Sequence, residues 1–203
     1  MNKPTQNTRH YSGKTDLQSF PNDVPVIDDA KLWQQFKGGS ETAFIKIYNE
    51  NFDVLLSYGC QFSRNQELVE DCIQDVFIYL RQKRKSLGAT DCIRFYLMKC
   101  MKRKLFEEIK SSNKSLSEIH QDGFQVVYSH EDFLIDRQIQ KERSDQLNKA
   151  LSILSRKQRE AIYYFYFQSL NYSQISELLG FDHVKSARNL VYKALSMLKS
   201  AMK

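Results

Sequence analysis

Apolar residues recur at intervals of three and four over two long stretches of the chain, residues 31–110 and 133–198. This spacing places them on one side of a helix, and no segment shows the apolar–polar alternation of a strand. Glycine (7) and proline (3) are scarce among the 203 residues, although sandwiches and barrels need both in their turns. The sequence therefore predicts an all-α protein.

The two periodic stretches predict two small helical domains, over residues 28–111 and 132–203. Between them, residues 112–131 are rich in Ser, Asn, Asp and His and lack a sustained period, which is typical of a flexible linker. Residues 1–27 contain all three prolines and show no period, so we expect a flexible N-terminal tail.

Within the first domain, a helical pattern starts near Lys31 and continues through four further predicted helices. Acidic residues outnumber basic ones before position 76, and basic residues outnumber acidic ones from there to position 110. This change of sign indicates either one cationic and one anionic partner or a set of solvated helix faces, and the charge pattern alone does not decide between them. The four predicted helices cover residues 40–48, 52–62, 65–83 and 92–110.

Composition excludes several classes of protein. The longest apolar run, Ala161–Phe167, is far shorter than the ~20 residues of a membrane-spanning helix, and no apolar block near the start indicates a secretory signal. We therefore expect a cytoplasmic protein without membrane insertion. The four cysteines form no CxxC pair and no histidine lies at ligand spacing from them, so the sequence predicts no metal site and no cofactor.

The most specific pattern lies in residues 170–198. Asn171, with Gln174 three residues later, predicts a capped helix start, and Gly180 predicts a left-handed helix end. A second helix follows directly. Two helices joined by so short a glycine turn form a helix-turn-helix unit.

The outward face of that second helix carries residue types suited to DNA. Arg and Asn make paired hydrogen bonds with base edges, while Lys and Ser contact phosphates. The alternative is an ordinary helical hairpin with a solvated basic face, but the caps, the turn glycine and the polar face all agree with DNA binding. The candidate residues are Lys185, Ser186, Arg188, Asn189 and Lys193.

An acidic row lies on the predicted helix 65–83. Asp71, Gln74 and Asp75 share the face opposite the apolar stripe, because three or four residues make one turn. Such a row suits a basic helical partner. A paired-carboxylate or metal site is the catalytic alternative, but no histidine, third carboxylate helix or phosphate loop supports it. We predict no catalytic residue and no enzymatic activity.

The predicted helix 92–110 interleaves basic and aromatic residues on one side. This pattern is typical of single-stranded DNA binding, since cations hold the backbone while rings stack on unpaired bases. The alternative is a solvated basic face with Phe106 in the core. The candidate residues are Phe95, Lys99, Lys102, Arg103 and Lys110.

These motifs resemble conserved regions of the sigma-70 family of bacterial RNA polymerase sigma factors. Residues 147–198 resemble the fourth region, which in that family binds the −35 promoter element. Residues 67–80 resemble the second region, where a D-x-x-Q-D-x-F pattern docks on the β′ clamp of the polymerase. In this chain that pattern consists of Asp71, Gln74, Asp75 and Phe77.

The resemblance also implies partners. In the family, the basic helix and the loop before it, here Arg84–Asp91, capture the melted −10 element. The two-domain form resembles the extracytoplasmic-function (ECF) group, whose members are typically held inactive by an anti-sigma factor. The implied partners are core RNA polymerase, through its β′ clamp and β flap, promoter DNA and an anti-sigma factor, without a small-molecule substrate.

The sequence thus predicts a sigma factor that binds core RNA polymerase and directs initiation at a specific set of genes. The alternative is a one-component helix-turn-helix regulator, whose N-terminal helical domain senses a ligand or dimerises. The acidic helix followed by a basic helix discriminates between the two, because a ligand-sensing domain has no reason to carry that pair.

Overall fold

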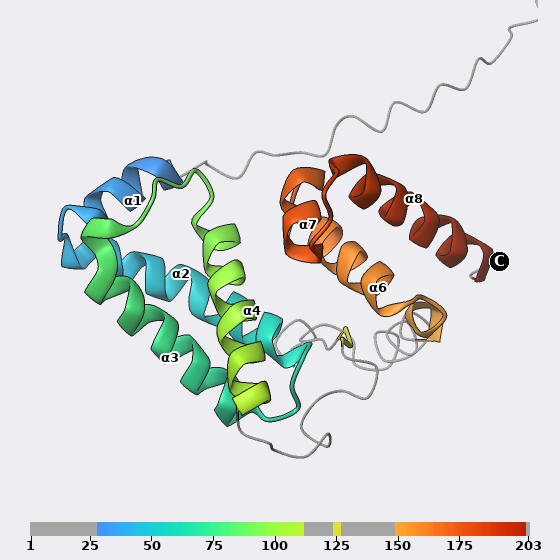
Figure 1. The fold of residues 1–203 in the computed structure, drawn as a ribbon, viewed down its shortest axis with the longest axis horizontal. Coiled ribbons are helices and arrows are strands. Elements are labelled where there is room, and N and C mark those ends of the chain that lie inside the picture. Colours follow the sequence, from blue (N-terminus) through green and yellow to red (C-terminus); the bar gives the residue numbers. More distant parts are fainter. Residues whose placement is uncertain (1–27, 112–123, 127–148, 202–203) are drawn as a thin grey trace, which may run out of the picture.

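The computed structural model describes residues 28–111, 124–126 and 149–201, which form two packed domains (Figure 1). The elements in these ranges are all helices, as the sequence predicts. The predicted tail, residues 1–27, and most of the predicted linker lie outside the described residues. No described helix is long and apolar enough to cross a membrane.

The first domain consists of four α-helices and a short 3₁₀ turn. Helices α2, α3 and α4 pack against one another, and α1 packs on α2 and α4 (Figure 1). The elements are α1 (Asp29–Lys37), α2 (Glu41–Cys60), α3 (Gln66–Lys83), η1 (Arg84–Ser86) and α4 (Ile93–Ser111).

Short polar side chains start these helices. The side chains of Asp28, Ser40 and Asn65 each accept a hydrogen bond from the backbone N–H three residues later. Each cap satisfies a donor that the first helical turn leaves unpaired. The caps therefore define where α1, α2 and α3 begin.

Helix α2 differs from its prediction. The sequence predicts separate helices over residues 40–48 and 52–62, whereas α2 is continuous. Between the two predicted helices, Asn51 is buried and donates its side-chain N–H to the backbone oxygen of Ile47 at 2.8 Å. A polar residue that looks like a break in the apolar pattern thus bonds within the helix.

The core of the first domain is built around Trp33, which is completely buried. Its indole N–H donates to the backbone oxygen of Gly88 at 2.8 Å, which fixes the loop after η1 to α1. Helices α2 and α3 approach closely at Gly59, where a Cβ would lie 2.4 Å from Cγ1 of Val69. Only glycine fits there.

The second domain contains the predicted helix-turn-helix. Asn171 and Gln174 form a reciprocal capping box, with both hydrogen bonds at 3.0 Å. Gly180 ends the first helix in the left-handed conformation, with φ +67°. The elements are α6 (Arg156–Ile162), the π-helical turn η3 (Tyr163–Phe167), α7 (Tyr172–Leu179) and α8 (Val184–Ala201).

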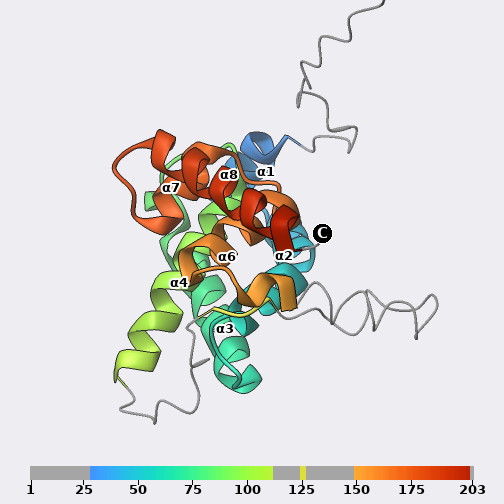
Figure 2. The same ribbon diagram turned by 90° about the vertical axis from the view of Figure 1, so that its right-hand side faces the viewer.

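Helix α8 covers the other helices of this domain. Its buried stripe consists of Ala187, Val191, Ala194 and Leu198, and it packs on α6 and α7 (Figure 2). The opposite side of α8 is exposed. Both helices of the helix-turn-helix therefore share one core with α6.

Candidate nucleic-acid and polymerase interfaces

The outward face of α8 is the first candidate interface. All five predicted DNA-binding residues are exposed, and the structure brings them together on the side of α8 away from its buried stripe. The guanidinium carbon of Arg188 lies 5.4 Å from the ring centroid of Tyr172, the first residue of α7. The five residues are Lys185, Ser186, Arg188, Asn189 and Lys193.

The acidic row of α3 is the second candidate interface. Asp71, Gln74 and Asp75 are exposed, together with Glu67 one turn earlier. The carboxylate of Asp75 forms an ion pair with Lys104 Nζ of α4 at 2.8 Å. Asp71 and Glu67 have no ion-pair partner within the described part of the chain, so these two carboxylates can form ion pairs with another protein.

Phe77 does not belong to this exposed row. It is buried, and its ring packs against Phe44 and Tyr48 of α2, at centroid distances of 6.1 and 4.8 Å. Two residues after Asp75, it lies on the core side of α3. The structure therefore gives Phe77 a core position, in which its ring packs α3 on α2, whereas its contact with the polymerase stays a prediction.

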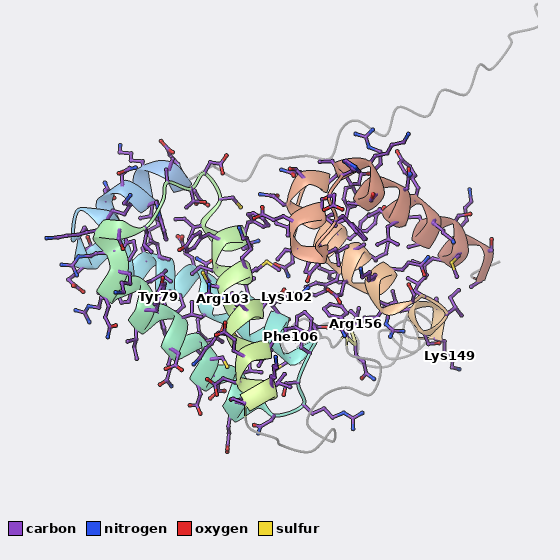
Figure 3. The ribbon with its side chains drawn as sticks, in the orientation of Figure 1. Tyr79, Lys102, Arg103, Phe106, Lys149 and Arg156 are labelled. Carbon is purple, nitrogen blue, oxygen red and sulfur yellow. The ribbon has the colours of Figure 1, made fainter. Side chains whose placement is uncertain are left out.

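The candidate residues of α4 share one side of the helix, but their side chains point toward different neighbours, as Figure 3 shows for Lys102 and Arg103. Lys99 and Lys102 lie toward the second domain and form ion pairs with Glu177 and Glu160. Arg103 lies toward α3, and its side chain is 73% exposed. The second domain therefore covers part of the predicted basic face of α4.

The remaining candidates of α4 lie near its two ends. Lys99 Nζ is 5.4 Å from the ring centroid of the half-buried Phe95, so a cation and a ring are adjacent there. Lys110 is exposed in the last turn. Toward α3, Arg103 and Tyr79 line a groove of about 380 Å³ between α3 and α4.

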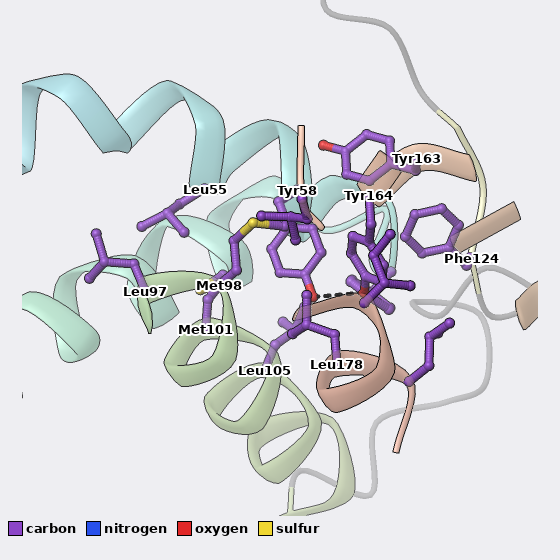
Figure 4. Packing of buried hydrophobic residues seen from close by; sticks show 14 of the residues in the cluster. Leu55, Tyr58, Leu97, Met98, Met101, Leu105, Phe124, Tyr163, Tyr164 and Leu178 are labelled. Carbon is purple, nitrogen blue, oxygen red and sulfur yellow. Dashed lines mark hydrogen bonds between the residues drawn. The ribbon is translucent and has the colours of Figure 1, made fainter. Parts of the chain in front are cut away.

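The two domains meet through buried tyrosines (Figure 4). Tyr58 of α2 and Tyr164 of η3 are both fully buried, and their hydroxyl oxygens lie 3.0 Å apart. The π-helical turn places Tyr163 beside Tyr164 on the side that faces the first domain, and Tyr163 stacks on Tyr58 at 6.3 Å. A side-chain hydrogen bond thus crosses the domain boundary inside an aromatic core.

Phe124 completes this interface from the middle of the predicted linker. It is fully buried, and its ring contacts Phe62 at 5.0 Å and Tyr163 at 5.5 Å. Its backbone oxygen accepts a hydrogen bond from Arg159 Nε at 3.1 Å. The predicted flexibility of the linker therefore does not extend to residues 124–126.

A carboxylate is buried next to the two tyrosines. Glu160 is only 3% exposed, and it accepts hydrogen bonds from Lys102 Nζ (2.9 Å), Arg156 Nε (3.1 Å) and the Tyr164 hydroxyl (3.2 Å). Lys102 donates to the backbone oxygen of Leu178 as well. We refer to Tyr58, Lys102, Glu160 and Tyr164 as the interdomain network.

Burial determines the protonation of the interface tyrosines. It raises the pKa of Tyr58 and of Tyr164 well above the usual value of 10, and the nearby carboxylate of Glu160 acts in the same direction. Burial also raises the pKa of Tyr163 to about 12. All three hydroxyls are therefore neutral near pH 7 and remain available as hydrogen-bond donors.

One comparison with known protein families concerns the second domain. Residues 144–198 match the family model described as "Sigma-70, region 4". This segment contains α6, η3, α7 and most of α8. The second domain is therefore similar to region 4 of the sigma-70 family. Sigma-70 factors bind RNA polymerase and recognise promoters, and they are generally non-enzymatic DNA-binding proteins.

Two solved structures share the fold. CnrH, solved in complex with the cytosolic domain of CnrY, is 16% identical with a TM-score of 0.57, over 86% of this chain and 97% of that one. The sigma factor RpoE of Bartonella quintana, solved with the anti-sigma factor NepR, is 17% identical with a TM-score of 0.54, over 78% of this chain and 96% of that one. No curated protein matches the chain in sequence.

Sequence reasoning missed the interdomain network. One signal was present, since Glu160 is the only acidic residue between positions 146 and 176 and directly precedes an apolar run. A charged residue beside a buried stretch needs a partner. Nothing in the periodicity identifies Lys102, from the other domain, as that partner. Among the described residues, no cluster of His, Cys, Asp and Glu could hold a metal ion.

Proposed function

We propose that this chain is a two-domain sigma factor of the ECF group, which directs core RNA polymerase to a specific set of promoters. The observation that carries the proposal is the exposed face of α8, because it lies in the second helix of a helix-turn-helix within the segment that matches sigma-70 region 4. Polymerisation would belong to the core enzyme, and the chain would act in the cytoplasm.

The two domains would divide the promoter between them. The second domain would place α8 in the major groove at the −35 element and contact the β flap. The first would dock the acidic row of α3 on the β′ clamp and present α4 and the loop before it to the opened −10 element. Exposed carboxylates opposite a basic helix favour rapid, oriented association.

Promoter opening would require the domains to separate. In the described arrangement, Lys99 and Lys102 pair with Glu177 and Glu160 of the second domain. Phosphates of a single strand cannot contact these lysines while the carboxylates occupy them. We therefore propose that polymerase binds the open form of the chain, in which both lysines are released.

The structural relatives suggest a further partner. RpoE of Bartonella quintana was solved with an anti-sigma factor, and CnrH with the cytosolic domain of CnrY. We propose that a protein of the anti-sigma type binds this chain as well. A one-component regulator remains the weaker alternative, since it has no need for the acidic row that α3 exposes.

Charge reversal on α3 tests the docking. Glu67→Lys and Asp71→Lys change exposed carboxylates that hold no ion pair in the described structure. Together they should abolish co-purification of the full-length chain with core RNA polymerase, because two attractions become repulsions. Asp53→Lys, which reverses an exposed charge on α2 outside the row, is the matched control and should bind normally.

Two outcomes would contradict this docking. One is undiminished co-purification of the double variant, which would place the polymerase contact elsewhere on the chain. The other is an equal loss with Asp53→Lys, which would mean that binding depends on total charge. Far-UV circular dichroism of each variant verifies that the helices are intact.

A further inference from the structure

Arg188, the candidate base-contacting arginine of α8, lies over an aromatic ring. Its guanidinium carbon is 5.4 Å from the centroid of Tyr172. Tyr172 also stacks on Phe165 of η3, with centroids 5.1 Å apart and an interplanar angle of 14°. The contacts of Tyr172 thus join η3, α7 and α8.

The ring of Tyr172 is held in place independently of Arg188. Tyr172 is the first residue of α7, directly after the Asn171 cap, and it is partly buried. The capped start of α7 and the stacking on Phe165 thus hold the ring under Arg188.

This contact leaves the hydrogen-bonding capacity of Arg188 intact. A carboxylate partner would occupy the guanidinium N–H groups, whereas a ring face attracts the cation and takes none of its five donors. Arg188 forms no ion pair with any residue in the described ranges. A restrained guanidinium with free donors is prepared for bidentate bonding to a guanine edge, and it loses less freedom on binding.

We propose that Tyr172 is a positioning residue that holds Arg188 in the orientation from which it contacts a base, and so sets the preference at one base pair of the upstream promoter element. The proposal rests on the proposed function, since it assumes that α8 recognises promoter DNA. It adds a specificity role for a residue of α7, outside the helix that enters the groove.

The test uses holoenzyme assembled from the full-length chain and core RNA polymerase. The probe is a promoter library randomised across the upstream element, and the measurement is the preference at each base pair after selection. The variants are Tyr172→Leu, Tyr172→Phe, Arg188→Ala and the double variant Tyr172→Leu with Arg188→Ala. Tyr166→Leu is the control, since it removes another exposed ring of the second domain that does not lie under Arg188.

We expect Arg188→Ala to abolish the preference at one base pair. Tyr172→Leu should weaken the preference at that same base pair about two- to fivefold, the range of an exposed cation–π contact. Tyr172→Phe, which keeps the ring, should restore it. In the double variant, Tyr172→Leu should add no further loss at that position.

A merely structural role for Tyr172 predicts a different result. Tyr172→Leu would then weaken selection evenly across the element, with a matching fall in the thermal midpoint of the chain, and this would overturn the proposal. An increased preference would overturn it too, because the ring would be withholding Arg188 from DNA. If the wild-type holoenzyme selects no upstream element, the proposed function fails and this inference fails with it.

Discussion

Replacing Tyr164 by phenylalanine should destabilise the folded chain far more than replacing Tyr58, although their hydroxyls share one hydrogen bond. In Tyr58→Phe, the Tyr164 hydroxyl still donates to Glu160 at 3.2 Å, so nothing is left unpaired. The expected cost is that of one neutral hydrogen bond, about 1 kcal/mol.

Tyr164→Phe has two consequences. It removes the hydrogen bond to the buried carboxylate of Glu160, and bonds to charged groups contribute about 1.5–3 kcal/mol. It also leaves the fully buried hydroxyl of Tyr58 without its partner, at a desolvation cost of ~1 kcal/mol or more. We expect a total loss of about 3 kcal/mol from the free energy of unfolding.

The double variant makes the prediction sharper. Once Tyr164 is phenylalanine, Tyr58→Phe removes a hydroxyl that has lost its partner and should restore about 1 kcal/mol. The same substitution is therefore destabilising in the wild-type chain and stabilising in the Tyr164→Phe background. Only two hydroxyls in direct contact produce this change of sign.

Urea unfolding of the full-length chain measures these free energies. Far-UV circular dichroism follows the helices of both domains, and the fluorescence of Trp33, the single tryptophan, follows the core of the first domain. Tyr48→Phe is the matched control, because it removes a partly buried hydroxyl far from the domain boundary. An equal cost of Tyr58→Phe in both backgrounds would refute the packing of the domains through this pair.

Three further perturbations test other parts of the structure. Above pH 10 the chain should lose stability, because burial raises the pKa of Tyr163 to about 12 while tyrosines of the unfolded chain deprotonate near 10, so that the unfolded state holds fewer protons. The rise in tyrosinate absorbance and the loss of helix should coincide, and an absorbance change without loss of helix would contradict this. Gly180→Ala should lower the free energy of unfolding by about 1 kcal/mol, because the residue has a φ of +67°, although no atom lies within 4 Å of the added Cβ. Gly88→Ala should be neutral, and equal thermal midpoints of the two variants would contradict the left-handed cap. Gly59→Ala should lower the free energy of unfolding, measured with urea, by about 2 kcal/mol, because its Cβ would lie 2.4 Å from Val69. A stabilised variant would mean that α2 and α3 are not in close contact.

Local signals predicted the second domain well. The Asn171–Gln174 box and Gly180 act within a few residues of the chain, so their sequence pattern determines their geometry. The exposed face of α8 follows from the same logic, because helical period alone separates Ala187 and Val191 from their polar neighbours.

Contacts between distant residues could not be predicted from the sequence. Phe77 carries a motif-like spacing, yet tertiary packing against α2 buries it. Phe124 lies in a polar, aperiodic stretch, and its burial depends on rings of both domains. Lys99 and Lys102 share a helical side with the other candidates of α4, but the sequence does not specify that the second domain covers that side.

Run-off transcription tests the central claim most directly. Core RNA polymerase is incubated with a library of genomic fragments from the source bacterium, with and without the full-length chain, and the transcripts are sequenced. A defined set of start sites that appears only when the chain is added, and whose transcripts decrease with Arg188→Ala, is the predicted result. Transcript ends that are the same with and without the chain would contradict it.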